Sequence, residues 1–275
     1  MKMILLLMLI IGLTSAFVGS LVGLGGGLIF VPALLFLAEY FEAFDWVNPQ
    51  NVVAMSLLIM IFTGLSSTLT YLKNNRVDIY SGLIFLIGSI PGALVGVWLN
   101  RYVEIESFEL YFGILVLFLA SLFFVKDYLL KYARNQQGKD KKFYIHRSFE
   151  LNGDTISYSF SIIVGIFIAF FVGLISGLFG IGGGSLMVTS MILFFSFPAH
   201  IAAPTSMFMI FVSSIVSSSA HIIAGHLVWS YALLAVPGAW LGGVLGAKLN
   251  QRLNGQVVEW ILRILMIIIG LRLIL

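Results

Sequence analysis

Two glycine clusters have the residue types and the spacing to bind an anion. They are Gly23-Leu24-Gly25-Gly26-Gly27 and Gly180-Ile181-Gly182-Gly183-Gly184. A helix that starts at a glycine turn points unpaired N–H groups and the positive end of its dipole at whatever precedes it. Glycine lets an anion approach this backbone closely because it has no Cβ. The candidate substrate-binding residues are therefore Gly25, Gly26, Gly27, Gly182, Gly183 and Gly184. Close helix packing by small residues is the alternative explanation, and no lysine follows the glycines as in a phosphate-binding loop.

Hydroxyl groups inside apolar stretches form a second set of candidates. Ser206, Ser213 and Ser217 recur at spacings of seven and four residues, so they share one face of a helix. With Ser56 and Thr205 they could hydrogen-bond an oxyanion. Serine also joins membrane helices to one another, and this structural role stays open for each of them.

Two ionisable side chains inside apolar stretches complete the candidate site. His221 could carry a coupling proton, because the unperturbed pKa of histidine lies near physiological pH; a hydrogen-bonded structural histidine is the alternative. Arg263 lies within the last apolar stretch, where ionisable groups are functional candidates. Glu259, four residues earlier, could instead hold it in a structural ion pair.

The composition excludes most soluble classes of protein. The chain has 275 residues, of which 60% are hydrophobic and 10% charged, whereas a soluble domain has about 25% charged residues. This predicts a multi-pass protein of the plasma membrane and excludes a cytosolic enzyme or a nucleic-acid binder. The apolar stretches contain no carboxylate pair, the histidines lack a metal-ligand spacing, and cysteine is absent. We therefore expect no enzymatic activity, no metal and no cofactor.

Stretches free of Asp, Glu, Lys and Arg define the expected helices. Most are close to the roughly 20 residues that cross a bilayer, but residues 3–38 and 155–197 are 36 and 43 residues long. Each of these two contains a glycine cluster, and three consecutive glycines disfavour a helix by about 1 kcal/mol each. We therefore expect two broken helices or helical hairpins, with the breaks buried in protein or lining a polar cavity.

The two halves of the chain are copies of one another. The segments VGLGGGLIFV and FGIGGGSLMV overlay without a gap, and Pro91-Gly92-Ala93 matches Pro237-Gly238-Ala239. This predicts an all-α polytopic membrane protein with two homologous halves, each a glycine-broken hairpin followed by three transmembrane helices. The expected units are residues 1–125, a basic linker at 126–154, and residues 155–275.

The linker also suggests an orientation. It carries seven basic residues, so the positive-inside rule places it in the cytoplasm. Whether each broken segment crosses the membrane once or returns as a hairpin stays open by this rule. With Arg263 left out because it lies within a helix, both arrangements give eleven basic residues inside and three outside. The length of the broken segments favours hairpins, which invert the second half relative to the first, as in many transporters.

The ordered, duplicated motifs resemble the TauE/SafE family, also called the toluene-sulfonate uptake permeases. Both halves open with GxGGG and close with PGAxxG, on either side of a basic linker, and the likeness covers essentially the whole chain. It implies transport of sulfite, thiosulfate or organosulfonates across the plasma membrane. We expect access to alternate as one half moves against the other, with a proton or sodium ion as the candidate coupling ion and membrane lipid as surroundings. One departure is that Thr189 stands where the first half has Pro32. A passive anion channel, or a transporter of another small organic anion, is the alternative.

Overall fold

The computed structural model describes residues 2–124, 144–151 and 154–274, and it is predominantly helical. In the first half the elements are α1 (Lys2–Val22), α2 (Gly27–Tyr40), the short η1 (Glu42–Phe44), α3 (Pro49–Leu72), α4 (Ile79–Asn100) and α5 (Ile105–Phe124). A hairpin of β1 (Tyr144–Leu151) and β2 (Asp154–Ser161) follows. In the second half they are α7 (Ile162–Phe179), α8 (Gly184–Phe194), α9 (Ala199–Ile223), α10 (Trp229–Asn250) and α11 (Gly255–Ile274).

The predicted fold class is confirmed, because the molecule is a bundle of long apolar helices. By length and composition, six helices of the described chain could cross a membrane. They are Ile4–Val22, Pro49–Leu72, Ile79–Asn100, Ile162–Phe179, Ala199–Ile223 and Trp229–Asn250. The many apolar side chains on the outside of the bundle, such as Ile87, Phe167 and Ile268, suit contact with lipid.

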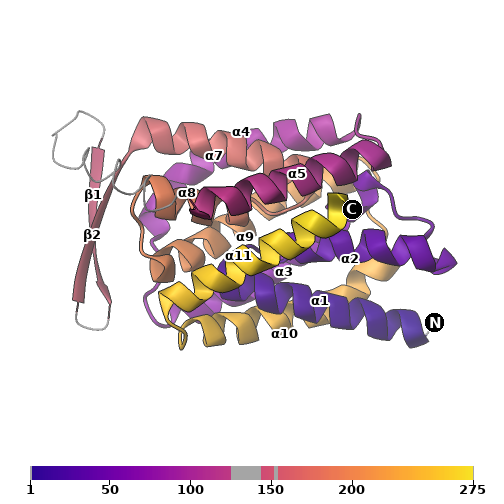
Figure 1. The fold of residues 1–275 in the computed structure, drawn as a ribbon, viewed down its shortest axis with the longest axis horizontal. Helices are drawn as coiled ribbons and strands as arrows, with labels where there is room; N and C mark the ends of the chain where they lie inside the picture. Colours follow the sequence, from indigo (N-terminus) through magenta and orange to yellow (C-terminus); the bar gives the residue numbers. More distant parts are fainter. Residues whose placement is uncertain (1, 125–143, 152–153, 275) are drawn as a thin grey trace.

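Both glycine clusters break a helix, as the sequence predicts. α1 ends at Val22 and α2 begins at Gly27, while α7 ends at Phe179 and α8 begins at Gly184. Gly26 (φ +99°) and Gly182 (φ +74°) adopt the left-handed backbone that side chains disfavour. α1 and α2 form a hairpin that turns back inside the bundle, and α7 and α8 form another that enters from the opposite end (Figure 1).

The most extensive helix contacts join one half of the chain to the other. α1 lies along α10, α4 lies along α7, and α3 crosses α9 at the centre. Glycines spaced four residues apart make the first two contacts possible. On α4, a Cβ at Gly88, Gly92 or Gly96 would overlap a carbonyl oxygen of α7, and on α10 a Cβ at Gly238, Gly242 or Gly246 would overlap one of α1. The PGAxxG segments therefore serve close helix packing.

Polar contacts identify which chain segments meet at each end of the bundle. Arg272 on α11 forms an ion pair with Glu39 on α2 at 3.2 Å. At the other end, Asn74 after α3 hydrogen-bonds to Gln251 after α10. Which end faces the cytoplasm stays a prediction from the basic linker, most of which lies outside the described residues.

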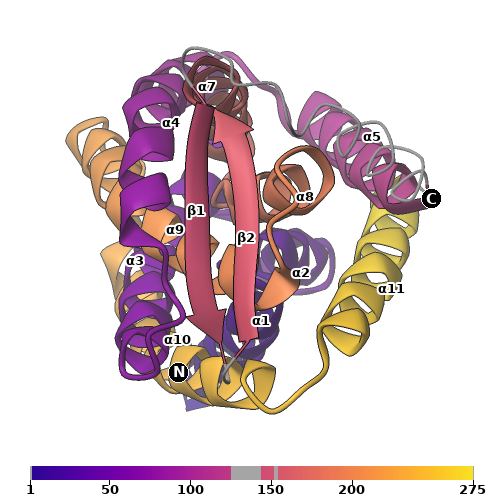
Figure 2. The same cartoon turned by 90° about the vertical axis from the view of Figure 1, so that its left-hand side faces the viewer.

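The β-hairpin is an element that the sequence analysis did not predict. β1 and β2 pair antiparallel from Tyr144–Ser161 to Leu151–Asp154, and Figure 2 shows the hairpin crossing one end of the bundle. Phe160 packs against Phe85 and Phe195, at ring-centroid distances of 4.9 and 5.6 Å. These aromatic contacts attach β2 to α4 and to the loop that follows α8.

Candidate functional site

The two glycine turns meet across the centre of the bundle. A Cβ at Gly27, the first residue of α2, would overlap the carbonyl oxygen of Gly180, and one at Gly184, the first residue of α8, would overlap that of Gly23. The start of α2 thus lies against the end of α7, and the start of α8 lies against the end of α1. This brings together the two clusters that the sequence singled out as an anion site.

Side chains of the opposite repeat hold the ends of α1 and α7. Two serines form one matched pair, in which Ser56 Oγ donates to Gly180 O (2.6 Å) and Ser206 Oγ donates to Gly23 O (2.8 Å). Two asparagines form another, in which Asn100 Nδ2 donates to Leu178 O (2.8 Å) and Asn250 Nδ2 donates to Leu21 O (2.6 Å). Carbonyls at a helix end lack intrahelical partners, so these bonds satisfy them inside an apolar bundle. In this conformation Ser56 and Ser206 therefore bind backbone carbonyls.

Met60 and Ile210 fill the space between the turns. The Met60 sulfur and the Ile210 Cδ1 each lie 3.0 Å from the place of a Cβ on Gly25. The same two side chains reach the other turn, where Met60 meets Gly182 and Ile210 meets Gly184. Both are fully buried, so the conformation described here is closed between the two clusters.

A small cavity remains beside the second glycine turn, at the start of α8. Its volume is about 10 Å³, close to what one water molecule needs. Its lining includes Gly182, Gly183 and Gly184, together with Ser89 on α4 and Ser213 on α9. The first N–H groups of a helix have no acceptor within that helix. The start of α8 and the buried Ser89 and Ser213 therefore lie beside this cavity, whose own surface is almost entirely apolar.

The other hydroxyl candidates have partners elsewhere. Thr205 Oγ1 accepts a hydrogen bond from the Asp78 N–H at 3.0 Å, and Ser217 Oγ donates to the Ser213 carbonyl at 3.0 Å. The Ser213 hydroxyl itself makes a long local contact of 3.4 Å with Ile210 O. Of the hydroxyl residues predicted to bind substrate, Ser213 therefore lies at the cavity.

His221 forms a pair with His226. Their Nδ1 atoms are 3.1 Å apart, so one ring donates a single hydrogen to the other. Burial and the nearby Arg101 lower the pKa of His226, which lies in the turn between α9 and α10. This geometry requires that the Nδ1 of the accepting ring carries no proton.

Arg263 lies on α11 with its guanidinium 5.1 Å from the centre of the Trp260 ring, a cation–π contact. The side chain of its predicted partner, Glu259, lies outside the described part of the structure. The predicted ion pair between these two residues stays a prediction.

Several residues of this region were not among the predicted site residues. Met60 and Ile210 each follow a matched serine by four residues, so superposing the two halves would have identified them. Asn100 and Asn250 also occupy matched places, each at the end of a PGAxxG helix. No comparable signal marks Ser89, because the second half has Ala235 at its place.

A buried carboxylate ties the β-hairpin to the bundle. Asp78, immediately before α4, accepts hydrogen bonds from Ser81 Oγ (2.5 Å), Tyr158 Oη (2.7 Å) and Arg147 Nη2 (3.1 Å). Burial alone would raise the pKa of Asp78, but these hydrogen bonds outweigh it and hold the pKa below its ordinary value. The Asp78 N–H also donates to Thr205, so one residue joins the hairpin, α4 and α9.

Comparison with known proteins identifies the family. The sequence model of a family described as "Sulfite exporter TauE/SafE" matches residues 8–273. "Probable membrane transporter protein YunE" of Bacillus subtilis (strain 168) is 45% identical over 269 residues, covering 98% of this chain and 96% of the relative. A "Probable membrane transporter protein" of Haemophilus influenzae is 25% identical, covering 87% and 82%, and MJ0441 of Methanocaldococcus jannaschii, with the same description, is 23% identical, covering 96% and 93%. No solved structure matches. The chain is a multi-pass membrane transporter that belongs to the TauE/SafE family.

Proposed function

We propose that this transporter carries small sulfur-containing anions, such as sulfite, thiosulfate or organosulfonates, and binds them at the start of α8. The observation that carries the proposal is the cavity where the α8 helix end meets Ser89 and Ser213. Backbone N–H groups and hydroxyls suit an oxyanion, because they donate hydrogen bonds without a fixed charge that would hold the anion too firmly. The family description supports the substrate class.

The geometry of the centre supports alternating access over a passive channel. Met60 and Ile210 close the space between the two turns, so an anion of several atoms needs the turns to part. A carrier requires such a closed state, with the substrate admitted from one side at a time. A proton or sodium ion would supply the driving force.

Uptake into proteoliposomes tests this function. Radioactive sulfite, thiosulfate and taurine are offered in turn, with and without a proton or sodium gradient, and saturable uptake of at least one of them is expected. Gradient-dependent accumulation distinguishes a carrier from a channel, which only equilibrates the anion. No movement of any of the three anions would refute the proposed substrate class.

Two serine variants on one helix test the site itself. Ser213→Ala removes a hydroxyl at the cavity, and since a hydrogen bond to a charged group is worth about 1.5–3 kcal/mol, KM should rise about tenfold or more. Ser219→Ala is the matched control on α9, because Ser219 is exposed and bonds to its own helix at Ile215 O. Equal KM values for the two variants would place the anion elsewhere.

A further inference from the structure

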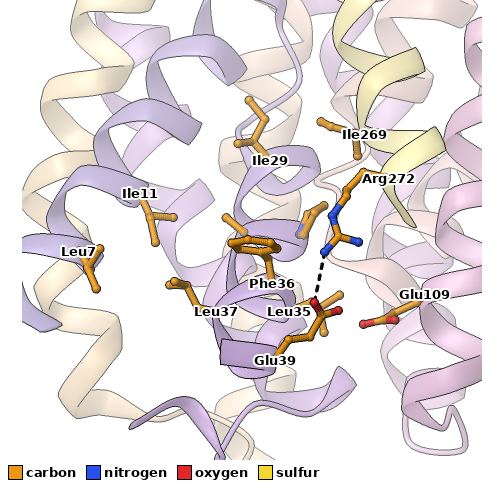
Figure 3. Close-up of a pocket in the computed structure, with 12 residues that line it drawn as sticks. Leu7, Ile11, Ile29, Leu35, Phe36, Leu37, Glu39, Glu109, Ile269 and Arg272 are labelled. Atoms are coloured by element: carbon orange, nitrogen blue, oxygen red, sulfur yellow. Dashed lines mark hydrogen bonds and ion pairs between the residues drawn. The ribbon is translucent and has the colours of Figure 1, made fainter. Parts of the chain in front are cut away.

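A second cavity, larger and separate from the glycine turns, forms a groove near one end of the bundle. It has a volume of about 650 Å³, within the range of small-molecule sites. It lies between the α1–α2 hairpin on one side and α5 and α11 on the other (Figure 3). Ile11, Ile29, Phe36 and Ile269 make most of its wall aliphatic or aromatic, which suits a hydrocarbon chain.

One part of this groove is charged. Arg272 Nη2 lies 3.2 Å from Glu39 Oε2, and the guanidinium lies 5.2 Å from the centre of the Phe36 ring. Figure 3 shows Glu109, from α5, directed toward the same pair. The side chains of Arg272 and Glu39 are 51% and 47% exposed, so both can exchange partners. Two carboxylates around one guanidinium can bind a cationic group and an anionic group at once.

The position of these charges matches a lipid headgroup. Glu39 and Arg272 lie in the last turns of α2 and α11, and Glu109 lies about one turn after the start of α5. The ends of membrane helices lie near the polar surface of the bilayer, where charged side chains meet headgroups. From there the aliphatic wall continues along α1 and α2 into the bundle, in the direction that an acyl chain takes.

We propose that this groove binds an aminophospholipid, with its primary ammonium between Glu109 and Glu39 and its phosphate on Arg272. A primary ammonium donates up to three hydrogen bonds, and two carboxylates can accept them. An anionic glycerol headgroup would meet a net negative site, and a choline headgroup has no N–H to donate. The bound lipid would connect the α1–α2 hairpin to α5 and α11 across the groove.

Native mass spectrometry of the detergent-purified protein tests the proposal. The protein is mixed with equal amounts of phosphatidylethanolamine, phosphatidylcholine and phosphatidylglycerol, and retained lipid is counted for each. We expect phosphatidylethanolamine to be retained about tenfold more than the other two, as for hydrogen bonds to a charged group. Equal retention of all three lipids would overturn the proposal.

Matched variants separate the groove from the general lipid surface. Glu109→Gln should lower phosphatidylethanolamine retention to that of phosphatidylcholine, while Glu104→Gln, the same charge change just before α5, should leave it unchanged. Ile11→Trp fills the aliphatic part and should lower retention of the bound lipid, whereas Ile87→Trp on the outer face of α4 should not. Because Glu109 is only partly buried, its amide variant keeps the fold. Equal effects of Glu109→Gln and Glu104→Gln would overturn the proposed headgroup site, whatever the transport assay shows.

Discussion

The carboxylate of Asp78 should contribute more to stability than any single partner that surrounds it. Its side chain is fully buried and accepts hydrogen bonds from Ser81, Tyr158 and Arg147. Hydrogen bonds to a charged group are worth about 1.5–3 kcal/mol each and are not additive. Asp78→Asn keeps one acceptor oxygen, so we expect a loss of about 2–4 kcal/mol, which is a fall in Tm of roughly 5–12 °C.

The partners should follow a definite order. Tyr158→Phe removes one buried donor and should cost about 1–2 kcal/mol. Arg147→Gln should cost no more than about 1 kcal/mol, because the Arg147 side chain is 34% exposed and solvent screens its charge. Arg272→Gln, which breaks the half-exposed pair with Glu39 at the other end, is the control and should change the free energy of unfolding least. Intrinsic-fluorescence melting in one detergent at pH 7 measures all four variants.

The pH dependence gives an independent check on the same carboxylate. The pKa of Asp78 is lowered in the folded protein, so its contribution is complete above its ordinary pKa of about 3.9 and is lost as the pH falls through the lower folded value. The difference in Tm between the wild type and Asp78→Asn should therefore be full at pH 6–7 and shrink below about pH 4. A larger effect of Arg147→Gln than of Asp78→Asn, or a difference independent of pH, would refute the reasoning.

Three further predictions concern the centre and the packing of the bundle. Met60→Cys introduces one thiol into a cysteine-free chain. Because Met60 is buried between the turns, a water-soluble maleimide should label this thiol several times more slowly than the thiol of Asn74→Cys. Equally fast labelling would show that the turns are open. Gly92→Val places a side chain against the Phe170 carbonyl, so the variant should not elute as a single monodisperse peak in size-exclusion chromatography. Gly225→Ala, with open space around it, should only lower the Tm slightly. A monodisperse Gly92→Val protein would contradict the packing. His221→Asn should leave the pH profile of anion uptake unchanged, because His221 is held in a hydrogen-bonded pair with His226. A shifted profile would show that the pair carries a coupling proton.

The fold was predictable from the sequence where one residue type decides the local structure. Glycines with positive φ break α1 from α2 and α7 from α8, and the low charge of the chain predicts spanning helices. The β-hairpin was not predictable in this way. Its strands lie in the polar stretch around the linker, and their attachment depends on Asp78 and Phe85, which are more than sixty residues away in the chain.

The candidate site was predictable in part. Both glycine clusters lie at the centre of the bundle and Ser213 lies at the cavity, while their binding of an anion stays a prediction. Whether Ser56 and Ser206 face a substrate or a protein group depends on where the ends of α7 and α1 lie. The spacing of residues along one helix cannot show this. In the closed conformation their hydroxyls hold carbonyl groups of the opposite repeat.

The exchange of helices between the halves has a consequence for biosynthesis. α1 is synthesised well before α10, along which it packs, and α4 is synthesised before α7, along which it packs. The glycine faces of the first half therefore stay without their partners until the second half has been inserted. Two separately synthesised halves would need to find each other in the membrane to complete either contact, and a chain truncated after the linker would expose glycine-lined helix faces to quality-control proteases.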